Sequence, residues 1–128
     1  MERRQRKKSK NSLPERSVER LLMDGLRSAG YLVIKSDAGA ASRYTRRSTK
    51  HEIPAGFPDL IALKPNAFPI FIEVKRAGGK LRPAQEVYLA HLRSMGYKVY
   101  EVYGQEEAMA LIHQLIASTS NSDSVLGP

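Results

Sequence analysis

Two acids and a lysine fall within the apolar runs of the stretch FPDLIALKPNAFPIFIEVKRAGG, which are otherwise apolar enough to form two buried strands. Asp59 opens the first apolar run, and Glu73 and Lys75 close the second. Carboxylate oxygens are ligands that Mg²⁺ prefers, usually one or two of them beside water and phosphate. An ammonium group next to such a cation can stabilise charge that develops on a reacting phosphate. These three residue types therefore suit metal-assisted phosphoryl chemistry, provided that the fold brings them together.

A hairpin between the two runs would bring them together. The KPNAF segment has turn chemistry in Pro65 and Asn66. A turn centred on Asn66 pairs Ile61 with Phe71 and places Asp59 opposite Glu73, with Cβ atoms ~5 Å apart. Because side chains alternate along a strand, Lys75 shares the face of Glu73. The sequence therefore predicts one cluster of two acids and a lysine.

Such a cluster needs compensation, because two like charges at this distance are unfavourable on a low-dielectric face. Lys75 could neutralise one carboxylate, whereas a divalent cation would use both. The competing interpretation is a plain surface salt bridge between Glu73 and Lys75, with Asp59 capping a turn. For the Glu-x-Lys spacing alone that interpretation is favoured, but the hairpin geometry favours a catalytic site.

The elements around the cluster follow from apolar periodicity and from helix and turn signals. The Ser-x-x-Glu sequence at 12–15 predicts a capping box that opens a helix ending near residue 29. Strands are expected at 31–36, 59–63, 69–75 and 97–103, with helices at 83–95 and 105–118. This order predicts an α/β fold with an αβββαβ core, in which a central mixed sheet is flanked by helices. We expect one domain over residues 12–117, a disordered basic tail at 1–11 and a disordered Ser-rich tail at 118–128.

The composition favours an anionic partner and an intracellular protein. The chain carries a net charge of +8, which favours nucleic acid over an anionic membrane. Six of residues 1–10 are Lys or Arg, and four more lie at 43–50 without an acid. With no cysteine, the chain has no disulfide framework, thiolate zinc site or Cys nucleophile. No apolar run is long enough to span a bilayer, and the N-terminus lacks the apolar core of a signal peptide.

These motifs together resemble the VRR-NUC branch of the PD-(D/E)xK nuclease superfamily, especially its small stand-alone viral and bacterial members. The resemblance lies in GFPDLIAL and in IFIEVKRAGGKLRPAQEVYLAHLRSMGYKVYEV, and it covers about residues 13–104. Gln85 and Gly96 occupy the family's positions for a glutamine that opens a helix and a glycine before the next strand. The VRR triplet in the family's name is absent, and the nearest basic cluster is RYTRRS.

The resemblance implies a restriction-endonuclease-like fold and a catalytic set of Glu15, Asp59, Glu73, Lys75 and Gln85. Asp59, Glu73 and the backbone carbonyl of Val74 would hold Mg²⁺ or Mn²⁺, and Gln85 would orient Lys75 or a phosphate. Glu19 is the alternative acid in the first helix, since Glu15 has a competing role in the capping box. The expected DNA contacts are the basic residues of the two loops: Arg43, Arg46, Arg47, Lys50, Arg76, Lys80 and Arg82.

The sequence thus predicts a Mg²⁺-dependent endonuclease that hydrolyses DNA phosphodiesters. Similarity to archaeal junction resolvases implies a homodimer that cleaves Holliday junctions or other branched DNA, in the cytoplasm or nucleoid or as a viral protein in a bacterial host. A nuclease of the same fold for flap, single-stranded or duplex DNA is one alternative. A non-catalytic nucleic-acid-binding module and a small basic RNA-binding protein are the others, although the complete Asp-Glu-Lys set disfavours the former.

Overall fold

The computed structural model describes residues 12–38 and 53–125, with side chains described up to residue 118. Helices and strands alternate in the predicted order, α-β-β-β-α-β-α. The elements are α2 (Glu15–Ser28), β1 (Leu32–Lys35), β2 (Leu60–Leu63), β3 (Ile70–Lys75), α4 (Pro83–Ser94), β4 (Lys98–Tyr103) and α5 (Gly104–Val125). The α/β fold class is therefore confirmed.

The four strands form one mixed sheet in the order β1-β2-β3-β4. The first two pairs of neighbours are antiparallel, whereas β3 and β4 run parallel. This arrangement follows from the connections, because a short turn suffices for an antiparallel hairpin, while α4 provides the long crossover that parallel strands need. The β2–β3 register pairs Ile61 with Phe71 and Leu60 with Ile72, as the turn at Asn66 predicts.

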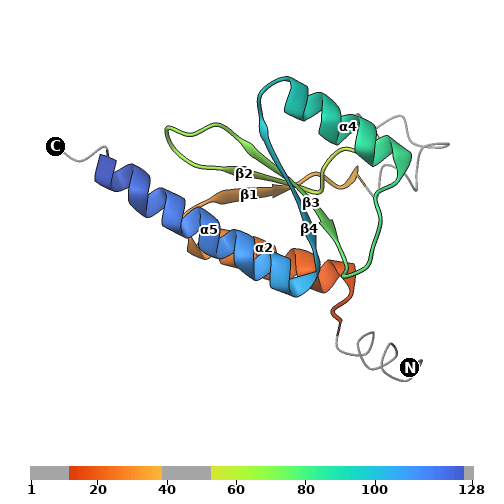
Figure 1. Cartoon of the computed structure of the whole chain (residues 1–128), viewed down its shortest axis with the longest axis horizontal. Coiled ribbons are helices and arrows are strands. Elements are labelled where there is room, and N and C mark those ends of the chain that lie inside the picture. Colours follow the sequence, from red (N-terminus) through yellow and green to blue (C-terminus); the bar gives the residue numbers. More distant parts are fainter. Residues whose placement is uncertain (1–11, 39–52, 126–128) are drawn as a thin grey trace.

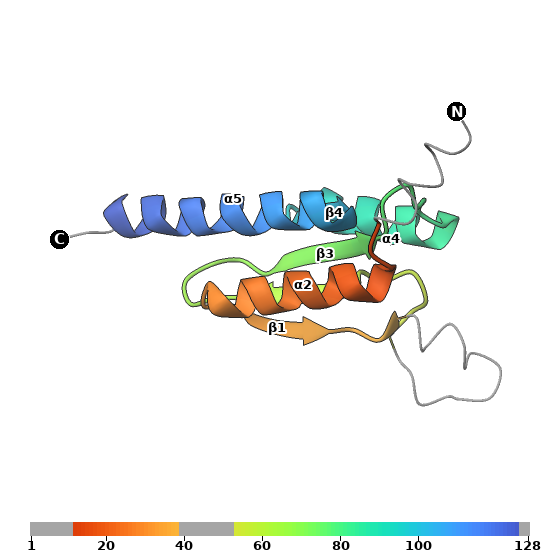
Figure 2. The same cartoon turned by 90° about the horizontal axis from the view of Figure 1, so that it is seen from below.

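Helices cover both faces of this sheet (Figure 1). Helices α2 and α5 contact each other on one face, and α4 lies on the other face beside β4 (Figures 1 and 2). The main core lies between the sheet and the α2–α5 pair, and all its members are buried apolar side chains, including Leu22, Leu26, Leu60, Ile72 and Leu111. Gly25 permits the close approach of the two helices, because a Cβ atom there would overlap the side chain of Ile112.

A smaller aromatic cluster fills the other face, beneath α4. The ring of Phe71 lies edge-on to Phe57 and Tyr97, with centroids 5.9 and 5.4 Å away. Phe57 also contacts Tyr88 of α4, and Leu89 and Leu92 of that helix are buried. This cluster fixes α4 against β3, the strand that carries Glu73 and Lys75 on the same face as Phe71.

Two sequence expectations at helix ends need correction. Helix α2 begins at Glu15, with Pro14 in extended conformation at the N-cap and no side-chain cap bond, so the predicted capping box does not form. Helix α5 continues to Val125, beyond the expected end of the last helix at residue 118. Helix propagation explains this, since each added residue gains a hydrogen bond once a helix has nucleated.

The basic tail at 1–11 and residues 39–52 of the basic loop lie outside the described residues. Within residues 12–38 and 53–125, no helix combines the length and hydropathy needed to cross a bilayer.

Candidate active site

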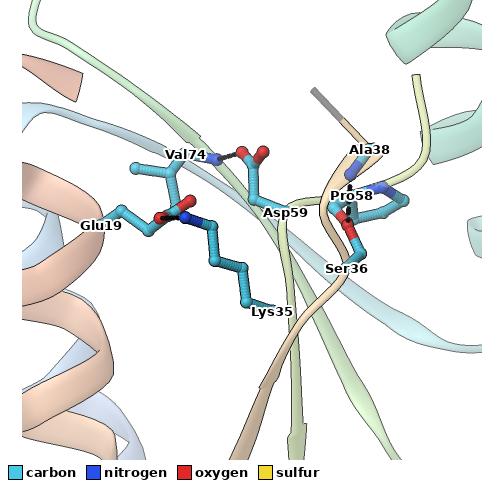
Figure 3. A network of polar contacts seen from close by, with 7 residues as sticks. All are labelled: Glu19, Lys35, Ser36, Ala38, Pro58, Asp59 and Val74. Carbon is cyan, nitrogen blue, oxygen red and sulfur yellow. Dashed lines mark hydrogen bonds and ion pairs between the residues drawn. The ribbon is translucent and has the colours of Figure 1, made fainter. Parts of the chain in front are cut away.

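The two acids meet where the β2–β3 hairpin opens. β2 begins only at Leu60, whereas its partner β3 continues past Ile72, which pairs with Leu60, through Glu73 to Lys75. Asp59 is the residue just before the start of β2, and its Oδ2 accepts a hydrogen bond of 2.8 Å from the backbone N–H of Val74. The carboxylate thus satisfies a donor that β2 no longer reaches (Figure 3). The predicted juxtaposition of Asp59 and Glu73 follows from this register.

Burial makes these carboxyl groups reluctant to ionise. Glu73 is 1% exposed and Lys75 is 7% exposed. Burial raises the pKa of Glu73 to about 9, helped by the charge of Asp59 and by a hydrogen bond that a protonated pair shares, while the charge of Lys75 lowers it. The pKa of Asp59 is also raised by burial, although the Val74 N–H and the hydrogen bond to Glu73 oppose the shift. Perturbation of this kind is characteristic of functional sites.

The two side-chain oxygen atoms of Glu73 differ in their hydrogen bonding. Its Oε2 accepts a hydrogen bond of 3.1 Å from Nε2 of Gln85. With both carboxyls ionised, the buried Oε1 has no hydrogen-bond partner among the residues that the structure describes. A buried oxygen without a partner is costly, and a hard divalent cation is a natural partner for it. The donor set therefore fits Mg²⁺ or Mn²⁺.

The protein would supply only part of the shell of such a cation. Across residues 12–38 and 53–125, no group of three or more acidic, His or Cys side chains is placed to hold a metal ion. Mg²⁺ is commonly held by one or two carboxylates, with water and phosphate oxygens completing its shell. Asp59 and Glu73 match that pattern, which leaves room for a substrate phosphate.

Lys75 is a buried ammonium group beside these acids. Its charge lowers the pKa of Glu73, which places the two side chains within electrostatic reach. None of the ion pairs in the described part of the chain includes Lys75. Lysine is almost never buried unless it is paired, and Glu73 provides Lys75 with an oppositely charged neighbour.

Gln85 links Glu73 to the start of α4. Its Oε1 accepts a hydrogen bond of 2.7 Å from the backbone N–H of Arg82, the N-cap residue, and its Nε2 donates to Glu73. The sequence predicted that Gln85 orients Lys75 or a phosphate, and this role stays a prediction. Among the described side chains, Gln85 contacts the Oε2 of Glu73.

Asp59 is positioned by a residue that the sequence did not single out. Ser36, which is 4% exposed, donates from Oγ to the carbonyl of Pro58 at 2.6 Å. Its backbone N–H donates to the carbonyl of Asp59 at 2.9 Å. These bonds fasten the end of β1 to the residues that carry the acid (Figure 3). A lone serine after a strand gives no sequence signal of this contact, since its partners lie 22 residues away.

The opposite side of the Pro58–Asp59 segment is held by a glycine. Gly56 has a positive φ of 95°, and a Cβ atom there would lie 2.8 Å from the backbone of Ala84 at the start of α4. Only glycine combines this conformation with this approach. The loop before Asp59 is thereby packed against the helix that carries Gln85.

The two acids of α2 differ in their surroundings. Glu19 forms an ion pair of 3.0 Å with Nζ of Lys35, and its side chain is 14% exposed. Glu15 is the exposed first residue of the helix, and its charge raises the pKa of both Asp59 and Glu73. The charge of Glu19 also raises the pKa of Asp59. Both acids are thus near the site, but Glu19 is engaged by a lysine.

The expected DNA-contacting residues divide into two groups. Arg76, Lys80 and Arg82 are exposed in the loop that directly follows Lys75. They therefore flank the carboxylate cluster at the end of β3. Arg43, Arg46, Arg47 and Lys50 lie outside the described residues.

Comparison with known proteins identifies the family. The sequence model of the VRR-NUC domain matches residues 3–106. A solved structure described as a VRR_NUC domain protein superimposes with a TM-score of 0.59 at 23% sequence identity, over 84% of this chain and 91% of its own. No curated protein matches the chain. The structural likeness shows a shared fold, consistent with a restriction-endonuclease-like core.

The match over residues 3–106 covers most of the chain, which therefore belongs to the VRR-NUC family of nuclease domains. The resemblance inferred from the Asp-Glu-Lys motifs is thus confirmed.

Proposed function

We propose that the protein is a Mg²⁺- or Mn²⁺-dependent endonuclease that hydrolyses phosphodiester bonds of DNA. The observation that carries the proposal is the open end of the β2–β3 hairpin. There, the buried Glu73 and the half-buried Asp59 have raised pKa values, and Oε1 of Glu73 lacks a hydrogen-bond partner among the described residues, next to the buried Lys75. A structural ion pair would not need this second acid.

Asp59 and Glu73 are the proposed cation ligands, through the oxygens that Val74 and Gln85 leave available. The Val74 carbonyl is a further candidate, because a strand residue directs its N–H and C=O to the same side and its N–H already points to Asp59. When bound, the cation would polarise the scissile phosphate and lower the pKa of a coordinated water.

Lys75 would stabilise the negative charge that develops as water attacks phosphorus and the phosphorus–oxygen bond breaks. Alternatively, Lys75 would help to deprotonate that water. Glu15 is the proposed additional acid from the first helix, acting indirectly or at a second cation. Glu19 is the less suitable choice, because its ion pair with Lys35 already neutralises it.

DNA binding is supported by the position of Arg76, Lys80 and Arg82, which follow the site along the chain and are exposed. Arg43, Arg46, Arg47 and Lys50 are proposed to add contacts to the phosphodiester backbone. Contacts of this kind position a duplex without reading its sequence. We therefore propose selectivity for DNA structure, with four-way junctions and other branched DNA as the preferred substrates.

A homodimer is part of this proposal, since junction cleavage needs two cuts on opposed strands. The edge strand β1 supports it, because Leu32 and Ile34 are 63% and 41% exposed beside a strand edge that no described residue pairs with. Such edges favour pairing with another chain. Light scattering on the purified protein tests the assembly, and a monomer at working concentration would contradict it.

The activity is tested by incubating the protein with labelled four-way junction, flap, single-stranded and duplex DNA, with and without Mg²⁺. We expect metal-dependent cleavage that is fastest on the junction. Faster cleavage of another substrate would correct the substrate but retain the nuclease. Binding without cleavage of any substrate would instead support a non-catalytic module.

A further inference from the structure

A basic cavity lies beside the carboxylate cluster and has no part in the proposed chemistry. It has a volume of about 480 Å³ and lies between the first half of α2 and the end of β1. Its lining consists of Arg16, Ser17, Glu19, Arg20, Met23 and Lys35. Three cations face one acid there, so the cavity carries an excess of positive charge.

The single acid of the cavity is already neutralised. Glu19 pairs with Nζ of Lys35 at 3.0 Å, and the hydrogen bond and charge of Glu19 raise the pKa of Lys35. The cavity therefore presents the charge of its two arginines to a ligand. The ion pair also holds the side chains of Glu19 and Lys35 in place in the lining of the cavity, where Glu19 is only 14% exposed.

The two arginines lack strong ion-pair partners in the part of the chain that the structure describes. Arg16 takes part in none of the ion pairs among the described residues. Arg20 approaches Asp24 only to 4.0 Å, and both side chains are more than half exposed, so that pair contributes little. Because the arginines stand four residues apart on one helix, their side chains emerge on the same side. Guanidinium groups in this arrangement suit phosphate oxygens, which they bind in bidentate fashion.

The cavity adjoins the catalytic acid. Lys35 directly precedes Ser36, whose N–H donates to the carbonyl of Asp59. The charges of Lys35 and Asp59 interact, as do those of Glu19 and Asp59. Figure 3 shows the Glu19–Lys35 pair on the side of Asp59 away from Pro58. A strand held at the carboxylates therefore passes close to this cavity.

We propose that this cavity is a phosphate subsite, in which Arg16 and Arg20 hold the backbone of the nucleic-acid strand a short distance from the cleaved bond. The subsite rests on the proposed function for the identity of its ligand. It adds a second basic surface, on α2, to the loop that contains Arg76, Lys80 and Arg82. The strand would then be gripped on both sides of the cluster.

The test compares two double variants of equal charge. Arg16→Gln/Arg20→Gln removes the cavity's arginines, and Arg27→Gln/Lys98→Gln removes two exposed cations from the far ends of α2 and β4. Binding of a fluorescein-labelled DNA duplex is measured by anisotropy in metal-free buffer over a range of salt concentrations. For the cavity variant we expect about tenfold weaker binding at low salt and a salt slope reduced by about 2, because each lost phosphate contact removes about one unit. The control should lose much less.

A conservative variant separates contact from folding. Arg16→Lys/Arg20→Lys keeps both charges but loses the bidentate geometry, so its affinity should fall between those of the wild type and the glutamine variant. Thermal unfolding of the cavity variants should match the wild type, since Arg16 and Arg20 are exposed, whereas the control also loses the 3.4 Å hydrogen bond from Arg27 to the carbonyl of Val33. Equal affinity and salt slope in the two charge-matched variants would overturn the subsite.

Further outcomes distinguish the ligand and the two proposals. Inorganic phosphate is added as a competitor. If it shifts the amide resonances of α2 while the cavity variant binds DNA like the control, the site takes free phosphate and the strand subsite is overturned. If no DNA is cut under any condition, but the cavity variant still loses affinity, the nuclease proposal fails and the subsite stands. If DNA is cut and the cavity variant binds DNA like the control, the subsite is overturned and the nuclease proposal stands.

Discussion

Both faces of strand β3 are buried, but burial stabilises the fold on one face and raises the pKa of Glu73 on the other. All six residues from Ile70 to Lys75 are buried. On one face, Ile70, Ile72 and Val74 join the core with α2 and α5. On the other face, Phe71 packs among aromatic rings, and Glu73 and Lys75 follow it towards the open end of the hairpin.

Burial of the first face stabilises the fold, since it removes apolar surface from water. Burial of Glu73 opposes folding, because the charged carboxylate is desolvated and its pKa rises to about 9. Because side chains alternate along β3, one face of the strand contributes to the stability of the fold and the other carries the proposed site. Substitutions on the first face should change the stability of the protein, and substitutions on the second should change its activity.

The largest expected effect is that of Glu73→Gln on activity. Removing a cation ligand should lower the cleavage rate by at least about 10²–10³-fold. The free energy of unfolding should be unchanged or raised, because the amide avoids burial of a charge. Cleavage rates and thermal melting of the metal-free protein measure the two quantities. A fully active variant, or one that is strongly destabilised, would break the comparison.

Ile72→Ala on the opposite face should have the converse effect. Ile72 is fully buried, and its truncation should lower the free energy of unfolding by about 2–5 kcal/mol. Denaturant titration measures this loss. Cleavage per folded molecule should stay near that of the wild type, and a collapse in activity without a loss of stability would refute the assignment of this face to the core.

The pH dependence of stability should sharpen the comparison. The pKa of Glu73 is raised from its ordinary 4.5 to about 9, so the folded protein binds more protons than the unfolded chain between these values. Stability should then be greatest below the lower value and fall as pH rises towards the upper one. Melting temperatures of the metal-free wild type and of Glu73→Gln over this range provide the measurement. Equal pH slopes in the two proteins would show that Glu73 does not carry the effect.

Gln85→Ala should lower activity less than Glu73→Gln does and stability less than Ile72→Ala does. It removes the side-chain bond to the N-cap of α4, which is worth about 1 kcal/mol. It also removes the bond that orients Glu73, for which about a tenfold loss of activity is expected. Glu86→Ala, in the same first turn and exposed, is the matched control. If both substitutions reduce cleavage equally, Gln85 has no specific role at Glu73.

Much of this arrangement follows from local sequence patterns. The turn residues at Pro65 and Asn66 set the β2–β3 register, and that register aligns Asp59 with Glu73. Alternation along β3 then assigns Glu73 and Lys75 to one face. These rules act over short distances along the chain, so they can be applied without knowledge of the tertiary structure.

The contacts that depend on packing between distant elements could not be read in this way. The hydroxyl of Ser36 binds Pro58 across two neighbouring strands, and the amide of Gln85 reaches Glu73 from another layer. At the start of α2, the Ser-x-x-Glu pattern was misleading, because extended Pro14 takes the N-cap position itself. Glu15 is therefore the first helical residue, whereas a capping box with Ser12 as N-cap would make it the third.

Cation binding tests the central claim most directly, independently of the choice of DNA substrate. Mn²⁺ is titrated by calorimetry into the wild type, Asp59→Asn, Glu73→Gln and the control Glu86→Gln. The account predicts a saturable site in the wild type and the control, weakened at least about tenfold in both carboxylate variants. Equal Mn²⁺ binding by all four proteins would contradict the claim that Asp59 and Glu73 form a metal site.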